Sequence, residues 1–158
     1  FVTHDQAEAL MLSHQVTLLL DGRVRQVGPP QELFYKPVDV DVARFFGGCN
    51  FFHGHMKNDV FHSEIGDFPV EKPITSNGHW LTATIRPEDI VISVDAAQGI
   101  EATVQSINFE GSTTRIQVQT YNNDYCVLTP DPGFSQGQSV RLYFPPERIR
   151  IFPPNKEG

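Results

Sequence analysis

The sequence predicts a mainly β protein in which a small β-barrel domain follows a short α/β segment. Up to Gly47 the apolar residues fall into short runs joined by a turn and into stretches with helical spacing. Beyond Gly48 they alternate at a period of two, in short segments that turn residues separate. Many short strands of this kind are typical of an all-β domain, and closing them into a barrel removes their unpaired edges. We therefore place the domains at residues 1–47 and 48–158.

The first ten residues predict the end of a buried strand that delivers a histidine, His4, to the start of a helix. Residues 1–2 are β-formers. Asp5 is placed to cap the first helical turn, with Glu8 as its capping-box partner. The helix would present an apolar stripe of Ala7, Leu10 and Met11. A histidine at such a corner can hydrogen-bond a bound phosphate, and the alternative is a histidine that merely ends a strand.

Residues 16–28 predict a β-hairpin. Two apolar runs flank Asp21-Gly22, and this dipeptide is a strong hairpin signal because both turn positions need positive φ. Pro29-Pro30 then opens a short helix over residues 31–35, which Pro37 ends, and a second helix follows over residues 40–46. Arg23 and Arg25 alternate outward on the hairpin, where a solvated face is expected and pairing with acids across an interface is the alternative.

Taken together, three segments of this region resemble the last part of an ABC-transporter ATPase domain. They are "FVTHDQAEAL", "LLLDGRVRQVG" and "GPPQELFYKPVDVDVARFFG", and their order and spacing agree with the importer-type subunits of that family. The resemblance implies that His4 is the switch histidine, which contacts the γ-phosphate of ATP and helps organise the attacking water. ATP and Mg²⁺ are then the implied cofactors of the full-length protein.

The motifs that hold nucleotide in that family are absent from the sequence. There is no G-x-x-x-x-G-K-[ST] loop, no Gly-rich signature and no acidic strand end for magnesium and water. In the family these lie upstream of the histidine, so we interpret residues 1–47 as a truncated α/β segment of an ABC ATPase domain. We expect this piece to bind no cofactor and not to hydrolyse ATP, because phosphoryl transfer depends on the backbone cradle and lysine of that loop.

Nine strands are expected in the second domain. They lie at residues 51–57, 60–64, 80–86, 90–94, 100–109, 113–120, 124–129, 139–144 and 147–152. The apolar alternation changes phase within the fifth of them, which predicts a bulge near Gln105 and Ser106. Trp80 is spaced as strand core, and Asn50 is expected to satisfy a backbone group at the domain entrance.

The second domain also carries a resemblance. "GGCNFFHGHM", "TIRPEDIVIS" and "GQSVRLYFPPERIRIF" look like the transport-associated, oligonucleotide-binding (OB)-like regulatory region of the same importer subunits, the TOBE domain. The most specific piece is Arg86-Pro87-Glu88-Asp89. The resemblance implies an OB-like regulatory β-barrel and a homodimer formed through it. It also implies membrane permease subunits and, indirectly, a solute-binding protein as partners, at the cytoplasmic face of the inner membrane.

One group of side chains in this domain suggests a metal site. If Asn58-Asp59 make a two-residue turn, His55 faces His62 and His53 faces Glu64, all on one side of the ribbon. Three imidazoles and a carboxylate could hold zinc or nickel. The opposite face carries Phe52, Met56 and Phe61. The alternative is therefore that the histidines form the solvated side of an amphipathic hairpin, with no metal.

Composition limits the remaining possibilities. A net charge of −7 argues against a nucleic-acid partner, because phosphate backbones require clusters of Lys and Arg. Cys49 and Cys126 form no C-x-x-C pattern and are expected to stay reduced. A stand-alone barrel that binds a small oxyanion or a metal is the alternative function. A molybdate-binding module, however, should show a Ser-Ala-Arg-Asn-like loop where Gly48-Cys49-Asn50 stands.

Overall fold

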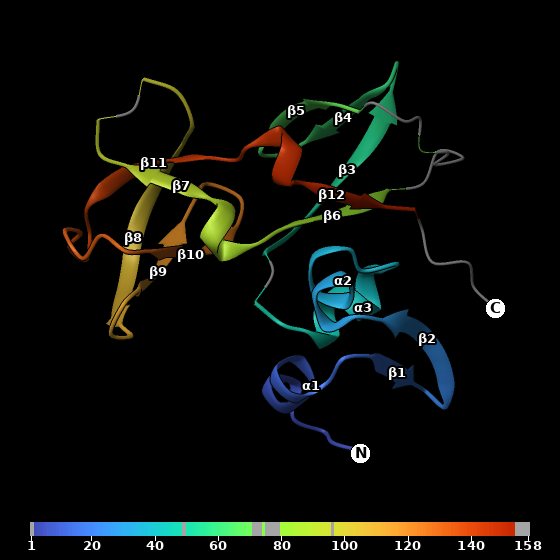
Figure 1. Ribbon diagram of the computed structural model, residues 1–158. Helices are drawn as coiled ribbons and strands as arrows, with labels where there is room; N and C mark the ends of the chain where they lie inside the picture. The colour runs from blue at the N-terminus through green and yellow to red at the C-terminus, as the bar shows by residue number, and fades with distance from the viewer. Residues whose placement is uncertain (1, 49, 71–73, 75–79, 96, 154–158) are drawn as a thin grey trace. The chain divides into compact units, whose positions relative to one another are not determined.

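The computed structural model describes residues 2–48, 50–70, 74, 80–95 and 97–153. The chain divides into two compact units, one within residues 1–48 and one within residues 49–154. Figure 1 shows their elements. No helix among the described residues is long and apolar enough to cross a membrane.

The described residues of the first unit form three short helices and one hairpin. In chain order they are α1 (Gln6–Leu12), β1 (Val16–Leu20), β2 (Arg23–Gly28), α2 (Pro30–Tyr35) and α3 (Val40–Phe45). β1 and β2 pair antiparallel, and Asp21 and Gly22 have φ of 51° and 71°. The predicted hairpin and its turn are therefore confirmed. The core of this unit consists of Leu18, Leu33, Val42 and Phe46.

The predicted strand before His4 is not present in the described residues. Val2 is 95% exposed and belongs to no strand, and Phe1 lies outside the described residues. A β-former alone cannot make a strand, because its backbone groups need a partner strand. The apolar stripe of α1 is only partly used, since Leu10 packs against the core whereas Met11 is 74% exposed.

Arg25 does not lie on a simply solvated face. Its Nη2 is 2.8 Å from Asp39 Oδ2 and 2.9 Å from Asp41 Oδ2. The hydrogen bond to Asp39 is the main cause that raises the pKa of Arg25. Asp39 also caps α3 by accepting a hydrogen bond from the Val42 N–H at 2.9 Å. The pair of acids therefore ties α3 to the hairpin, and the expectation of a solvated arginine was wrong.

The described residues of the second unit form ten strands. They are β3 (Asn50–Lys57), β4 (Val60–Ser63), β5 (Gly66–Pro69), β6 (Leu81–Ile85), β7 (Val91–Ser93), β8 (Ile100–Phe109), β9 (Thr114–Gln119), β10 (Asp124–Thr129), β11 (Ser139–Tyr143) and β12 (Arg150–Phe152). They form two antiparallel five-stranded sheets, ordered β12-β6-β3-β4-β5 and β10-β9-β8-β11-β7. The prediction of a mainly β, OB-like domain is confirmed.

Of the more detailed strand predictions, one is confirmed and three are wrong. The register of β8 against β9 shifts between Val104 and Ser106, which confirms the bulge. β5 was missed, because its four residues include one glycine, one proline and a single buried apolar side chain, Phe68. The last predicted strand starts too early, since Pro146–Arg148 form a 3₁₀ turn (η2) before β12. Trp80 is not core, because it is 68% exposed and precedes β6.

The chain passes from one sheet to the other at two corners of similar sequence. β6 leads through a 3₁₀ turn at Pro87–Asp89 (η1) into β7 of the other sheet, and β11 leads through η2 into β12 (Figure 1). The sequences at the corners correspond, IRPEDIVI over residues 85–92 and FPPERIRI over residues 144–151. In each, a proline fixes φ where the chain leaves its sheet. The strand before each corner therefore belongs to one sheet and the strand after it to the other, which joins the two sheets into one domain.

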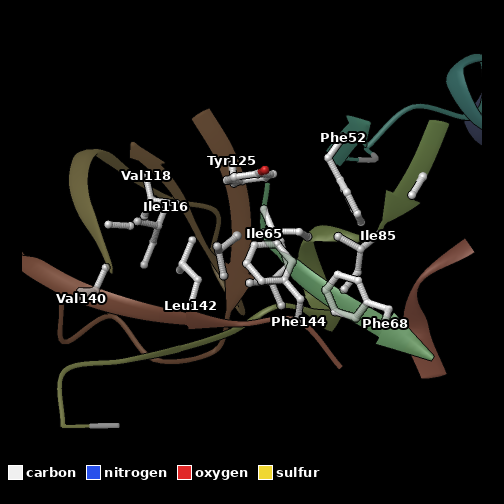
Figure 2. Close-up of a cluster of buried hydrophobic side chains, with 14 of the residues drawn as sticks. Phe52, Ile65, Phe68, Ile85, Ile116, Val118, Tyr125, Val140, Leu142 and Phe144 are labelled. Carbon is white, nitrogen blue, oxygen red and sulfur yellow. The ribbon is translucent and has the colours of Figure 1, made fainter. Parts of the chain in front are cut away.

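One continuous core lies between the sheets. Figure 2 shows Phe52, Phe68 and Ile85 of the first sheet at one end of this core and Ile116, Val118 and Leu142 of the second sheet at the other. Tyr125 and Phe144 lie between these groups, with ring centroids 5.3 Å apart in an edge-to-face arrangement. Burial raises the pKa of Tyr125 to about 12, so its hydroxyl is neutral.

Candidate functional site

The segment around His4 is held by a local hydrogen-bond network. Asp5 caps α1 by accepting from the Glu8 N–H at 3.1 Å, as predicted. Glu8, however, does not return the bond to the Asp5 backbone. Its Oε2 accepts from the Thr3 hydroxyl at 2.7 Å, and Thr3 Oγ1 accepts from the Asp5 N–H at 3.0 Å. The residues on both sides of His4 are thus fixed, while His4 itself is exposed.

The β-domain begins with Asn50, whose buried side-chain amide hydrogen-bonds the backbone of a residue far along the chain. Asn50 Nδ2 donates to the Cys126 carbonyl at 2.8 Å, and its Oδ1 accepts from the Cys126 N–H at 2.7 Å. Asn50 starts β3 of one sheet and Cys126 lies on the edge strand β10 of the other. The side chain therefore replaces a missing strand partner and links the two sheets, which confirms the predicted backbone role.

The Arg86-Pro87-Glu88-Asp89 corner connects the two sheets. Arg86 and Pro87 are buried at the end of β6, and Asp89 N–H donates to the Arg86 carbonyl at 3.0 Å. Asp89 Oδ1 lies 3.7 Å from Arg148 Nε of the matching corner. The Asp89 carboxylate therefore does not face solvent alone, because it lies near the positive charge of Arg148 at the second corner.

The four predicted metal-site side chains are only partly brought together. Asn58 and Asp59 have φ of 50° and 59°, and His55 pairs with His62 across β3 and β4, as expected. His53 Nδ1 instead lies 3.3 Å from Thr82 Oγ1 on β6.

Glu64 is the fourth predicted ligand. β4 ends at Ser63, which pairs with Gly66, so Glu64 lies in a two-residue turn and receives a hydrogen bond from Asn123. The expected His53–Glu64 pair was wrong for that reason. Within the described ranges, no group of three or more His, Cys, Asp or Glu side chains could hold a metal ion.

Two of the open hollows on the described part of the β-domain are candidates for a ligand. One, of about 540 Å³, is lined by polar side chains of β8, β9 and β11, including Glu101, Gln119 and Arg141. Arg141 is already engaged, since its Nη2 is 2.6 Å from Glu101 Oε1 and its Nη1 donates to the Gly99 carbonyl at 3.1 Å. A ligand anion would have to compete with that ion pair. The other hollow, of about 630 Å³, is mainly apolar.

Cys126 is the cysteine that lies within the described residues. Cys126 is a half-buried free thiol, and Arg115 Nη1 lies 3.4 Å from its Sγ. Arg115 also makes two hydrogen bonds to Glu110, at 2.6 and 3.2 Å. Cys49 lies outside the described residues.

Comparison with known proteins finds a matching domain family and a similar protein. Residues 83–152 match the TOBE domain family. The spermidine/putrescine import ATP-binding protein PotA of Aster yellows witches'-broom phytoplasma (strain AYWB) is 34% identical over 153 residues, which is 96% of this chain and 36% of PotA. The chain thus spans about a third of that relative.

A solved structure resembles part of this chain. It is the molybdate-bound form of ModG, a cytoplasmic molybdate-binding protein, with a TM-score of 0.52 and 11% identity over 66% of this chain and 96% of that chain. At this identity the likeness shows the fold alone. The TOBE match and the identity to PotA support the resemblance found in the sequence: the chain contains a TOBE domain over residues 83–152 and is similar to the C-terminal part of an ABC-importer ATP-binding subunit.

Proposed function

We propose that this chain is the C-terminal regulatory portion of the ATP-hydrolysing subunit of an ABC importer, and that it helps couple ATP hydrolysis to solute uptake. The observation that carries the proposal is the extent of the match to PotA. It covers 96% of the chain, so it extends over most of residues 1–47 as well as over the β-domain. A free-standing ligand-binding barrel would have no use for the first of these.

In the full-length protein, His4 is proposed to contact the γ-phosphate of ATP, with Mg²⁺ bound by motifs that this sequence does not contain. Two features of the segment fit that role. The imidazole is exposed, and the backbone on either side of it is fixed by the Thr3–Asp5–Glu8 network. A histidine positioned in this way can organise a nucleophilic water without a large loss of conformational entropy.

The test of this role is the ATPase rate of the full-length protein with His4→Ala. We expect the turnover rate to fall by about 10²-fold, the usual effect of removing a positioned acid-base group. His14→Ala is the matched control, because His14 is an exposed histidine just beyond the same helix and should keep the wild-type rate. A His4→Ala protein with the wild-type rate would contradict the role. The 158-residue chain alone should show no hydrolysis.

The β-domain is proposed to pair with that of a second copy, so that the two ATPase halves keep contact as they open and close. The complete subunit would bind membrane permease subunits at the cytoplasmic face of the membrane, and these would receive solute from a binding protein.

The dimer can be tested by light scattering on this chain at increasing concentration. We expect a mass twice the 17.8 kDa of one chain, approached as the concentration rises. A constant mass of one chain at the highest concentration reached would exclude pairing through the β-domain.

A further inference from the structure

A row of polar side chains crosses the outer face of the first sheet. His55 on β3 is the direct partner of His62 on β4, and His62 is the direct partner of Asp67 on β5. The two imidazole rings stack, with centroids 5.4 Å apart and planes 28° apart. Because the three residues occupy neighbouring strands at one level, the sheet itself holds them together.

The contact with Asp67 determines which nitrogen of His62 is available. His62 Nδ1 lies 2.8 Å from Asp67 Oδ1, so the Nδ1–H donates to the carboxylate. The lone pair is then on Nε2. Metal-binding histidines have this arrangement, in which a carboxylate fixes the tautomer and makes the ring a better ligand.

The other end of the row is bounded by an aromatic ring. Trp80 meets His55 edge-on, with centroids 5.7 Å apart. His55 is exposed and the His62 side chain is 31% exposed, so both rings remain accessible to an ion. Torsions between an sp³ carbon and a flat ring have broad energy wells, so the His55 imidazole can turn a nitrogen toward an ion at His62 Nε2 while Asp67 keeps the His62 ring in place.

We propose that His55 and His62, with Asp67 positioning His62, bind a divalent transition-metal ion such as Zn²⁺ or Cu²⁺. Imidazole nitrogen is suited to these ions, whereas Ca²⁺ and Mg²⁺ prefer oxygen ligands. The protein supplies two nitrogens and water completes the coordination, so the site is weaker than a structural zinc centre with four protein ligands. This inference does not rest on the proposed transport function.

The experiment is calorimetric titration of the 158-residue chain with ZnCl₂, and separately with CuCl₂. We expect saturable binding of one ion, tighter for Cu²⁺ than for Zn²⁺. His55→Gln and His62→Gln should each weaken it by at least about tenfold, and Asp67→Asn by about tenfold. Because the ligands lie on two strands that meet only in the folded state, Zn²⁺ should also raise the Tm.

The matched control is His53→Gln. His53 lies on the same strand and the same face, two residues from His55, but contacts Thr82. It should keep the wild-type affinity, and MgCl₂ should leave the Tm unchanged. Equal Zn²⁺ affinity in the wild type and the His55→Gln/His62→Gln double variant would overturn the proposal, and so would an equal loss in His53→Gln. Tm values without metal verify that each variant is folded.

Discussion

Gly54→Ala is expected to destabilise the β-domain by about 3 kcal/mol, at the upper end of overpacking effects. Gly54 lies in β3 opposite Ser63 of β4. A Cβ at this position would lie 2.3 Å from the His62 carbonyl oxygen and 2.6 Å from the Phe61 ring. The oxygen belongs to the backbone and Phe61 is fully buried, so neither can move without separating the strands. Urea unfolding followed by Trp80 fluorescence measures the loss, because Trp80 is the only tryptophan and lies in this unit.

Gly111→Ala separates the clash from the general cost of replacing a glycine. Gly111 has φ of +87° and nothing within 4 Å of an added Cβ. Its substitution should cost only about 1 kcal/mol, the strain of an L residue in the left-handed region. If Gly54→Ala and Gly111→Ala cost the same, the close approach of β4 to Gly54 is not what requires glycine there.

Asn50→Leu is the second large effect, and we expect a loss of about 3 kcal/mol in the free energy of unfolding. The leucine has a similar volume but leaves the N–H and C=O of Cys126 without the two hydrogen bonds of 2.7 and 2.8 Å. Each buried backbone group left without a partner costs about 1–3 kcal/mol. Asn50 is itself buried at 7% exposure, so water cannot easily replace it. Urea unfolding again measures the change.

The control for Asn50 is Asn108→Leu. Asn108 is an exposed strand residue of the same domain, and its substitution should change the unfolding free energy by less than about 0.5 kcal/mol. Amide hydrogen exchange adds a local measurement, since the Cys126 N–H should lose protection in Asn50→Leu and keep it in Asn108→Leu. A stability loss without faster exchange at Cys126 would contradict the role assigned to the amide.

Features set by neighbouring residues could be predicted from the sequence. Both hairpin turns, Asp21-Gly22 and Asn58-Asp59, have the positive φ that their residue types favour. The bulge at Gln105 follows from a change of phase within one strand. In these cases the residues that predict the feature lie within a few positions of the feature itself.

Features set by distant partners could not be predicted. Asn50 and Cys126 are 76 residues apart, so the backbone group that Asn50 binds is defined only by how the two sheets meet. The third histidine of the metal hypothesis failed for a similar reason, because β6 brings Thr82 to His53. Asp67 was missed because β5, a short edge strand with weak propensity, was not recognised.

The central proposal is that the chain is part of a transport ATPase, and its most direct test is the native coding sequence immediately upstream of the codon for Phe1. We expect one continuous reading frame that encodes a G-x-x-x-x-G-K-[ST] loop, a Gly-rich signature and an acidic strand end, in that order. Those motifs would supply the phosphate cradle that His4 lacks here. A start codon close to Phe1, or an upstream frame without the phosphate loop, would contradict the claim.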